Sequence, residues 1–137
     1  MTKPYFVIDN NILISRLLLP NSLPAQAVRL ASEKGILLIS DETLQELTTV
    51  FERRKFDKYV SVEERKEFIR KLEIIAQKIE IIENIKVCCD RKDDKFIELA
   101  INGKAGLIIT GDEDLLVLNN FEGIEILTPK DFATKFS

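Results

Sequence analysis

Short, continuously apolar runs alternate along this chain with segments of helical periodicity, and this alternation is what most limits the fold. The runs at residues 5–8, 36–39 and 107–109 contain only apolar side chains, and residues 124–126 add a further short strand pattern. Strands of this kind are typical of parallel sheets, whose two faces are both covered. We therefore predict an α/β fold of three layers, with helices on both faces of a central parallel sheet of about five strands.

Helix start and stop signals divide the segments between these runs. Ser22 and Ser40 each predict a helix start, and Ser61 forms a capping box with Glu64. The expected helices begin near residues 12, 22, 40, 61, 93, 114 and 128, and the helix that begins at 61 extends to about residue 79. The β-branched stretch over residues 79–87 predicts a short strand. Because the chain has no repeat, low-complexity tract or linker, we predict one domain over residues 1–137.

The absence of histidine restricts the chemistry of this chain. It excludes imidazole as a general base, the Ser-His-Asp and Cys-His nucleophile systems, and zinc sites that need histidine. The two cysteines, Cys88 and Cys89, are neighbours, which excludes a disulfide framework and favours a reducing, cytoplasmic location. No apolar run is long enough to cross a membrane. A formal net charge of -3 excludes a general polyanion binder, so contact with nucleic acid requires a local basic patch.

Acidic residues follow the predicted strands. Asp9 ends the first strand, and Asp112 follows the fourth. In a doubly wound sheet these two strands are neighbours where the winding order reverses, and ligands bind beyond their carboxyl ends. Glu46 lies in the helix after the second strand, and Asp93 and Asp94 stand at the start of a later helix. We expect all four segments to meet at one edge of the sheet.

Carboxylates gathered at one edge repel one another, so without a counter-charge their pKa values rise and some take up protons. A divalent cation resolves this conflict. Oxygen ligands without histidine or cysteine favour the hard ions Mg²⁺ or Mn²⁺, which keep water ligands and leave room for a substrate phosphate. Such an ion lowers the pKa of a bound water and neutralises charge that develops at phosphorus. The residues thus predict metal-assisted hydrolysis of phosphodiester bonds, with water as the nucleophile.

Each of these acids also has an ordinary structural explanation. Asp112 can begin the helical turn that follows it, and Asp93 or Asp94 can cap a helix. Glu46 can face solvent, as most glutamates on helices do. Asp9 has the fewest such explanations, because it ends an apolar strand at the predicted reversal point. The functional interpretation therefore depends on the joint pattern.

Over nearly the whole chain, these segments resemble the motifs of the PIN-domain family, and most closely its single-domain, VapC-like toxins of toxin-antitoxin systems. Ile8-Asp9-Asn10-Asn11 is similar to the strand-ending D-T-N motif, with Asn10 in place of threonine. Residues 40–47, SDETLQEL, resemble the segment that carries the family's glutamate. Residues 90–96, DRKDDKF, resemble D-P-x-D-[DN]-x-F with arginine in place of proline, and residues 110–116, TGDEDLL, match T-G-D-x-D-L-L closely.

The resemblance implies a ribonuclease that depends on Mg²⁺ or Mn²⁺ and is the toxin of a toxin-antitoxin pair. The implied metal-binding and catalytic quartet is Asp9, Glu46, Asp93 and Asp112. Asp93 is favoured over Asp94, since the family tolerates asparagine at the second position. The further implied site residues are Asp114, an additional acid, and Asn11 and Thr110, which would orient ligands or substrate. The implied partners are an RNA substrate, a cognate antitoxin protein and a second copy of the chain in a homodimer, without a membrane.

One basic cluster is a candidate for binding the substrate. Arg53, Arg54 and Lys55 form the densest positive patch, which we expect to hold RNA phosphates near the acidic site, whose own charge would otherwise repel a polyanion. The alternative interpretation is a solvated helix end. Phe68 and Leu72, in the long helix, can face the core, a dimer partner or an antitoxin, and the pattern does not choose among these.

Other acid-rich functions fit the sequence less well. A response-regulator receiver needs an aspartate at the end of its third strand, and residues 79–87 contain none. A haloacid-dehalogenase-like phosphatase needs D-x-D after its first strand, where this chain has Asp9-Asn10-Asn11. The remaining alternative is a PIN-fold module that binds RNA or a protein partner without cutting. The presence of all four acids argues against such a module.

Overall fold

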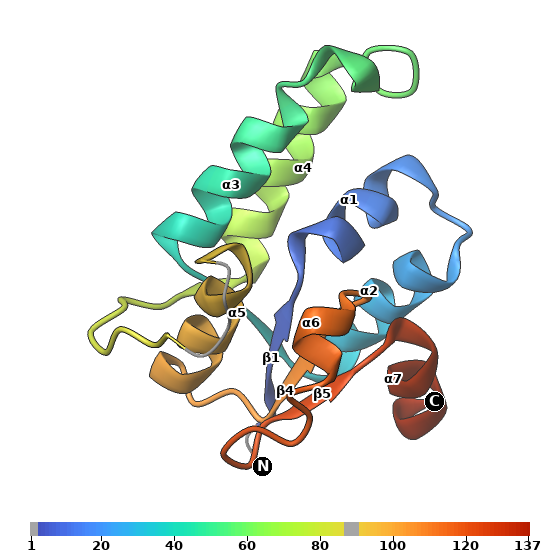
Figure 1. Cartoon of the computed structure of the whole chain (residues 1–137). Coiled ribbons are helices and arrows are strands. Elements are labelled where there is room, and N and C mark those ends of the chain that lie inside the picture. The colour runs from blue at the N-terminus through green and yellow to red at the C-terminus, as the bar shows by residue number, and fades with distance from the viewer. Residues whose placement is uncertain (1–2, 87–90) are drawn as a thin grey trace.

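The computed structural model describes residues 3–86 and 91–137, and it has the predicted α/β form with a central parallel sheet (Figure 1). The five strands are β1 (Tyr5–Ile8), β2 (Ile36–Ile39), β3 (Gln77–Lys78), β4 (Leu107–Ile109) and β5 (Glu125–Leu127). They lie in the order β3-β2-β1-β4-β5. Because β1 pairs with both β2 and β4, the winding order reverses at β1, as predicted. Ile8 pairs with Ile109, so the ends of β1 and β4 lie side by side.

Each face of the sheet has its own apolar core, because successive side chains of a strand point to opposite faces. Phe6 and Ile8 pack on the face covered by α1 (Asn10–Leu18), α2 (Leu23–Lys34) and α7 (Pro129–Phe136). Val7 and Ile108 pack on the other face, against α5 (Arg91–Asn102) and α6 (Glu113–Leu116). Figure 1 shows α5 and α7 on opposite sides of the strands. The expected three layers are therefore confirmed.

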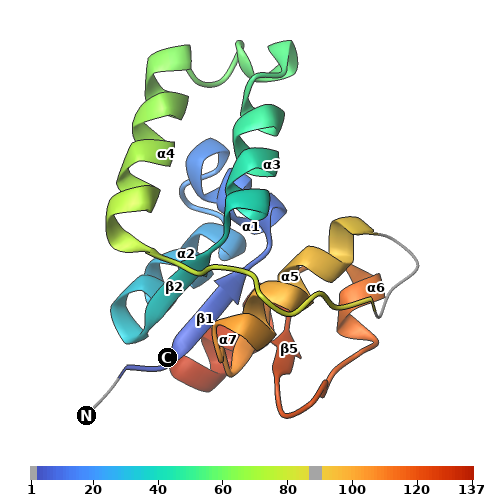
Figure 2. The ribbon, with the colours of Figure 1, turned by 90° about the vertical axis from the view of Figure 1, so that its left-hand side faces the viewer.

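Two helices form an antiparallel hairpin that projects beyond the sheet (Figures 1 and 2). They are α3 (Asp41–Phe51) and α4 (Val62–Ile75), and the 3-10 helix η1 (Arg54–Phe56) lies in the turn between them. Leu72 is buried in the core, and the ring of Phe68 packs edge-on against Phe51 with 5.8 Å between centroids. Both residues therefore face the core, and both line a groove of about 880 Å³ between α1, α2 and α4.

The structure corrects several predicted boundaries. The helix expected from residue 12 begins at Asn10, because the Asp9 side chain caps it. The helix expected to reach residue 79 ends at Ile75, since Ala76 adopts extended geometry and the next two residues pair with β2. The prediction of a strand over residues 79–87 was wrong in its position. The strand β3 ends before residue 79, and the described residues 79–86 form no strand.

Residues 79–86 instead follow β3 as irregular chain, in which Ile79, Ile81 and Ile85 pack against the second core. Cys88 and Cys89 lie outside the described residues. Within residues 3–86 and 91–137, no helix is long and apolar enough to cross a membrane.

Candidate active site

Asp9 lies at the carboxyl end of β1 and is largely buried. Its backbone N–H donates to the Ile109 carbonyl of β4 at 2.9 Å. Its carboxylate accepts hydrogen bonds from the Thr110 hydroxyl at 2.7 Å and from the backbone N–H of Asn11 at 3.1 Å. Burial raises the pKa of Asp9, and the nearby carboxylates of Asp112 and Glu46 also raise it, while the two hydrogen bonds oppose this shift. Asp9 is therefore an acid that a nearby positive charge would stabilise in its ionised form.

Thr110 connects Asp9 to the acids that follow β4. The residue is fully buried, and its hydroxyl accepts a hydrogen bond from the backbone N–H of Asp112 at 3.0 Å while it donates to Asp9. Asp112 caps α6, because its side chain accepts from the backbone N–H of Asp114 at 2.9 Å. Asp112 thus has the ordinary role of a helix cap, and its carboxylate also lies near that of Asp9. One hydroxyl holds the ends of two neighbouring strands in a fixed relation.

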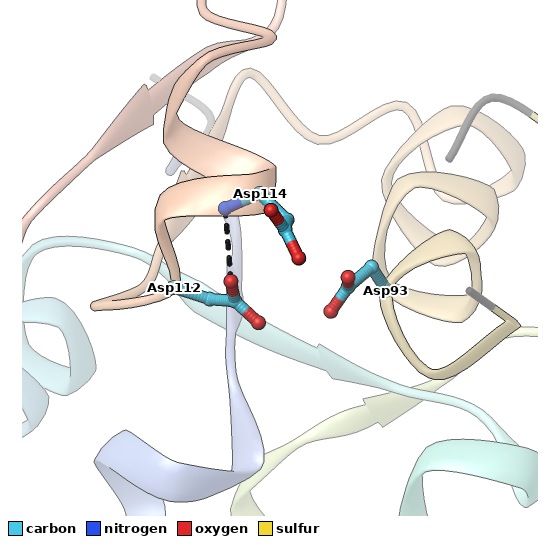
Figure 3. Close-up of side chains that lie close together, drawn as sticks. All are labelled: Asp93, Asp112 and Asp114. Carbon is cyan, nitrogen blue, oxygen red and sulfur yellow. Dashed lines mark hydrogen bonds between the residues drawn. The ribbon is translucent and has the colours of Figure 1, made fainter. Parts of the chain in front are cut away.

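Three carboxylates, those of Asp93, Asp112 and Asp114, point toward one another where α5 and α6 begin (Figure 3). One oxygen of each lies within 4.8 Å of the others. Around a six-coordinate Mg²⁺ or Mn²⁺, neighbouring oxygen ligands lie about 3 Å apart and opposed ones about 4 Å, so these carboxylates would have to move closer together to share one ion. Asp93 is buried, Asp112 is half-buried and Asp114 is exposed, which leaves the cluster accessible from solvent. The all-carboxylate donor set fits a hard divalent cation.

Glu46 approaches the same region from α3, but its carboxylate is held by two other side chains. The amide nitrogen of Asn10 donates to Oε1 at 2.8 Å and to the Thr43 carbonyl at 2.9 Å. The Lys95 ammonium lies 2.5 Å from Oε2 and also donates to the Lys92 carbonyl at 2.7 Å. Glu46 therefore lies near Asp9 without joining the cluster of three aspartates.

Sequence reasoning missed Lys95 and the role of Asn10. Lys95 stands two residues after Asp93 in α5 and is buried, although a lysine in an amphipathic helix ordinarily predicts a surface position. In the sequence Asn10 stands out only as a departure from threonine in the D-T-N motif, and nothing near it in the chain identifies Glu46 as its partner. Asp94, the alternative to Asp93, is also buried but is not one of the three clustered acids.

The remaining predicted residues lie farther from the acids or contribute less. Asn11 offers its backbone N–H to Asp9, while the residue itself is exposed. Arg53, Arg54 and Lys55 are exposed at the far tip of the α3–α4 hairpin, and both views show this tip remote from α5 and α6. About 8 Å of helix separates Glu46 from Phe51, where α3 ends before this basic cluster. The structure thus does not bring the basic cluster next to the acids.

Comparisons with known proteins place this arrangement in a family. The family model described as "PIN domain" matches residues 5–114. The uncharacterized protein MJ1680 of Methanocaldococcus jannaschii is 35% identical over 144 residues, which cover 95% of this chain and 90% of that relative.

Two solved structures share the fold. PAE2754 from Pyrobaculum aerophilum has a TM-score of 0.64 at 13% identity, over 98% of this chain and 89% of that chain. VapBC2 from Rickettsia felis, solved bound to a DNA fragment from its promoter, has a TM-score of 0.63 at 11% identity, over 90% of this chain and 98% of that chain. Because the family model spans most of the chain and includes the strand-end acids up to Asp114, this protein belongs to the PIN-domain family.

Proposed function

We propose that this protein is an endoribonuclease that depends on Mg²⁺ or Mn²⁺. The observation that carries the proposal is the meeting of Asp93, Asp112 and Asp114 at one edge of the sheet, with Asp9 buried beside Asp112. Membership of the PIN-domain family supports it, since these domains are generally nucleases that use divalent metals. The absence of histidine also supports it, because activation of water must then come from a metal and carboxylates.

The three clustered aspartates would hold the cation, and Asp9 would add charge behind them. A bound divalent ion would supply a water of lowered pKa and neutralise charge at the phosphate. The chain's own contribution is positional: Thr110 fixes the Asp9 carboxylate and the Asp112 backbone relative to each other. In the proposed hydrolysis a water molecule gives up a proton as its oxygen bonds to phosphorus, the bond from phosphorus to the leaving ribose oxygen breaks, and that oxygen takes up a proton.

RNA is the proposed substrate, and the cytoplasm is the proposed location. Arg53, Arg54 and Lys55 would contact its phosphates, because they lie exposed on one tip away from the acids that repel a polyanion. An RNA chain that contacts both this basic cluster and the clustered aspartates must run along α3. The salt dependence of RNA binding measures this contribution, because each phosphate that the cluster neutralises makes the logarithm of the binding constant fall more steeply with the logarithm of the salt concentration.

We also propose that this protein is a toxin whose partners are a cognate antitoxin and a second copy of itself. The similarity of its fold to that of VapBC2 supports the first partner. The groove between α1, α2 and α4 offers apolar surface from Leu17, Phe68 and Ile75 that a partner would cover. Co-expression with the neighbouring reading frame tests for an antitoxin by co-purification, and light scattering of the purified chain tests for a dimer.

Incubation of the purified protein with RNA and Mn²⁺ tests the nuclease directly. We expect cleavage by the wild type, its loss in EDTA, and its loss in Asp112→Asn. Asp131→Asn removes the same charge from an exposed position on α7, on the opposite face of the sheet from α5 and α6, and should cut like the wild type. Cleavage that persists in both EDTA and Asp112→Asn would refute the metal-nuclease proposal. A wild type that binds Mn²⁺ and RNA without cutting any RNA would instead favour a binding module.

A further inference from the structure

Lys95 places a buried positive charge at the edge of the acidic site. Its side chain is 4% exposed, and its ammonium donates to Glu46 and to the Lys92 carbonyl. It also lies 5.1 Å from the centre of the Phe96 ring, which adds a favourable cation–π contact. Burial of an ammonium is costly unless it is paired and hydrogen-bonded. The pairing with Glu46 is therefore a specific arrangement, not an accident of a flexible surface side chain.

The other oxygen of Glu46 accepts a hydrogen bond from Asn10 of α1. Asn10 is itself buried, and its amide group is anchored by a second bond to the Thr43 carbonyl. Donors from α1 and α5 thus fix a carboxylate that α3 carries, and these three segments are far apart in the sequence. A carboxylate has about four acceptor positions, so two donors leave part of Glu46 able to accept a further hydrogen bond. The Glu46 side chain is 30% exposed, which leaves that capacity accessible.

We propose that Lys95 is a positioning residue that keeps Glu46 out of the metal-binding cluster of Asp93, Asp112 and Asp114. Glu46 then serves the reaction from outside the ligand set of the metal. This inference rests on the proposed function. Of the predicted quartet it leaves Asp93 and Asp112 as ligands of the ion, and it keeps Glu46, like Asp9, outside the ligand set. The physical reason is that movement of Glu46 toward the ion would leave the buried Lys95 ammonium without its anion.

A double-mutant cycle on Mn²⁺ affinity tests this division without reference to activity. Titration calorimetry compares the wild type, Glu46→Gln, Lys95→Met and the double variant. In the wild-type background, Glu46→Gln should weaken Mn²⁺ binding by less than about 3-fold, because Glu46 is not a ligand. In the Lys95→Met background, the same change should weaken binding by at least about 10-fold, because the released Glu46 has joined the cluster. Lys130→Met, an exposed lysine on α7, controls for the loss of one positive charge.

Turnover of RNA provides the second measurement. Glu46→Gln and Lys95→Met should each lower kcat by at least about 10-fold with little change in KM, and the double variant should be no slower than either single variant. A merely structural Lys95 would lower the unfolding temperature and Mn²⁺ affinity together, in both backgrounds. Glu46→Gln keeps an oxygen that Lys95 can bond, so this variant tests the first expectation even if Lys95→Met does not fold.

The outcomes separate this inference from the function on which it rests. A wild type that neither binds Mn²⁺ nor cuts RNA would refute the proposed function, and the role of Lys95 with it. If the wild type binds Mn²⁺ and cuts RNA, but Glu46→Gln weakens Mn²⁺ binding equally in the wild-type and Lys95→Met backgrounds, only the role of Lys95 would be refuted. A Glu46→Gln protein that loses Mn²⁺ binding as severely as Asp112→Asn would also refute it.

Discussion

Replacement of Arg65 by methionine tests how the α3–α4 hairpin is held together. The Arg65 side chain is 5% exposed, and its guanidinium donates to the Phe51 carbonyl at 2.6 Å and to the Asp57 carboxylate at 2.7 Å. It also donates to the Ser61 carbonyl at 3.3 Å. The last turn of α3 has no basic side chain of its own. Arg65 of α4 therefore supplies the cation and the donor that the carboxyl end of α3 requires.

The magnitude of the effect follows from burial of these partners. The bond to the Phe51 carbonyl is buried, and a carbonyl left there without a donor costs about 1–3 kcal/mol. The Asp57 side chain is 59% exposed, so that ion pair contributes less than about 1 kcal/mol. Methionine retains part of the aliphatic packing. We therefore expect Arg65→Met to lower the free energy of unfolding by about 1–4 kcal/mol.

Urea unfolding followed by circular dichroism measures this loss. The matched control is Arg70→Met on the same helix, whose ion pair with Glu67 is exposed. That change should alter the free energy of unfolding by less than about 1 kcal/mol. Equal and small effects of the two substitutions would show that Arg65 does not hold the tip that carries Arg53. In that case the reasoning from its buried hydrogen bonds would be wrong.

Two further predictions concern the strand-end acids. Because burial raises the pKa of Asp9 in the folded protein, its ionised form destabilises the fold as pH rises from the unfolded pKa through the folded one. Asp9→Asn should therefore raise the unfolding temperature at neutral pH in EDTA, with no gain below about pH 4, and calorimetry over this pH range checks the sign. Thr110→Val removes the hydroxyl between Asp9 and Asp112 and should weaken Mn²⁺ binding about 10- to 100-fold by titration calorimetry, whereas Thr110→Ser should not.

The parallel sheet and its reversal point were predictable from local patterns. An uninterrupted apolar run requires cover on both faces, and a short strand joined to the next by a helix must pair in parallel. The end of α4 was not predictable in this way. Its apolar spacing continues past Ile75, and only the pairing of Gln77 and Lys78 with β2 ends the helix. Hydrogen bonds to a distant strand thus override a local helical pattern.

The sequence by itself determined the three-layer fold, the edge of the sheet at which the acids gather, and the chemistry that an all-carboxylate set without histidine favours. Only the tertiary structure decided how those acids are divided. Glu46 bonds Asn10 and Lys95, which are 36 and 49 residues away, whereas Asp93 meets Asp112 and Asp114. Periodicity reports which face of a helix is buried, but the partner of a buried charge depends on how α1, α3 and α5 pack together.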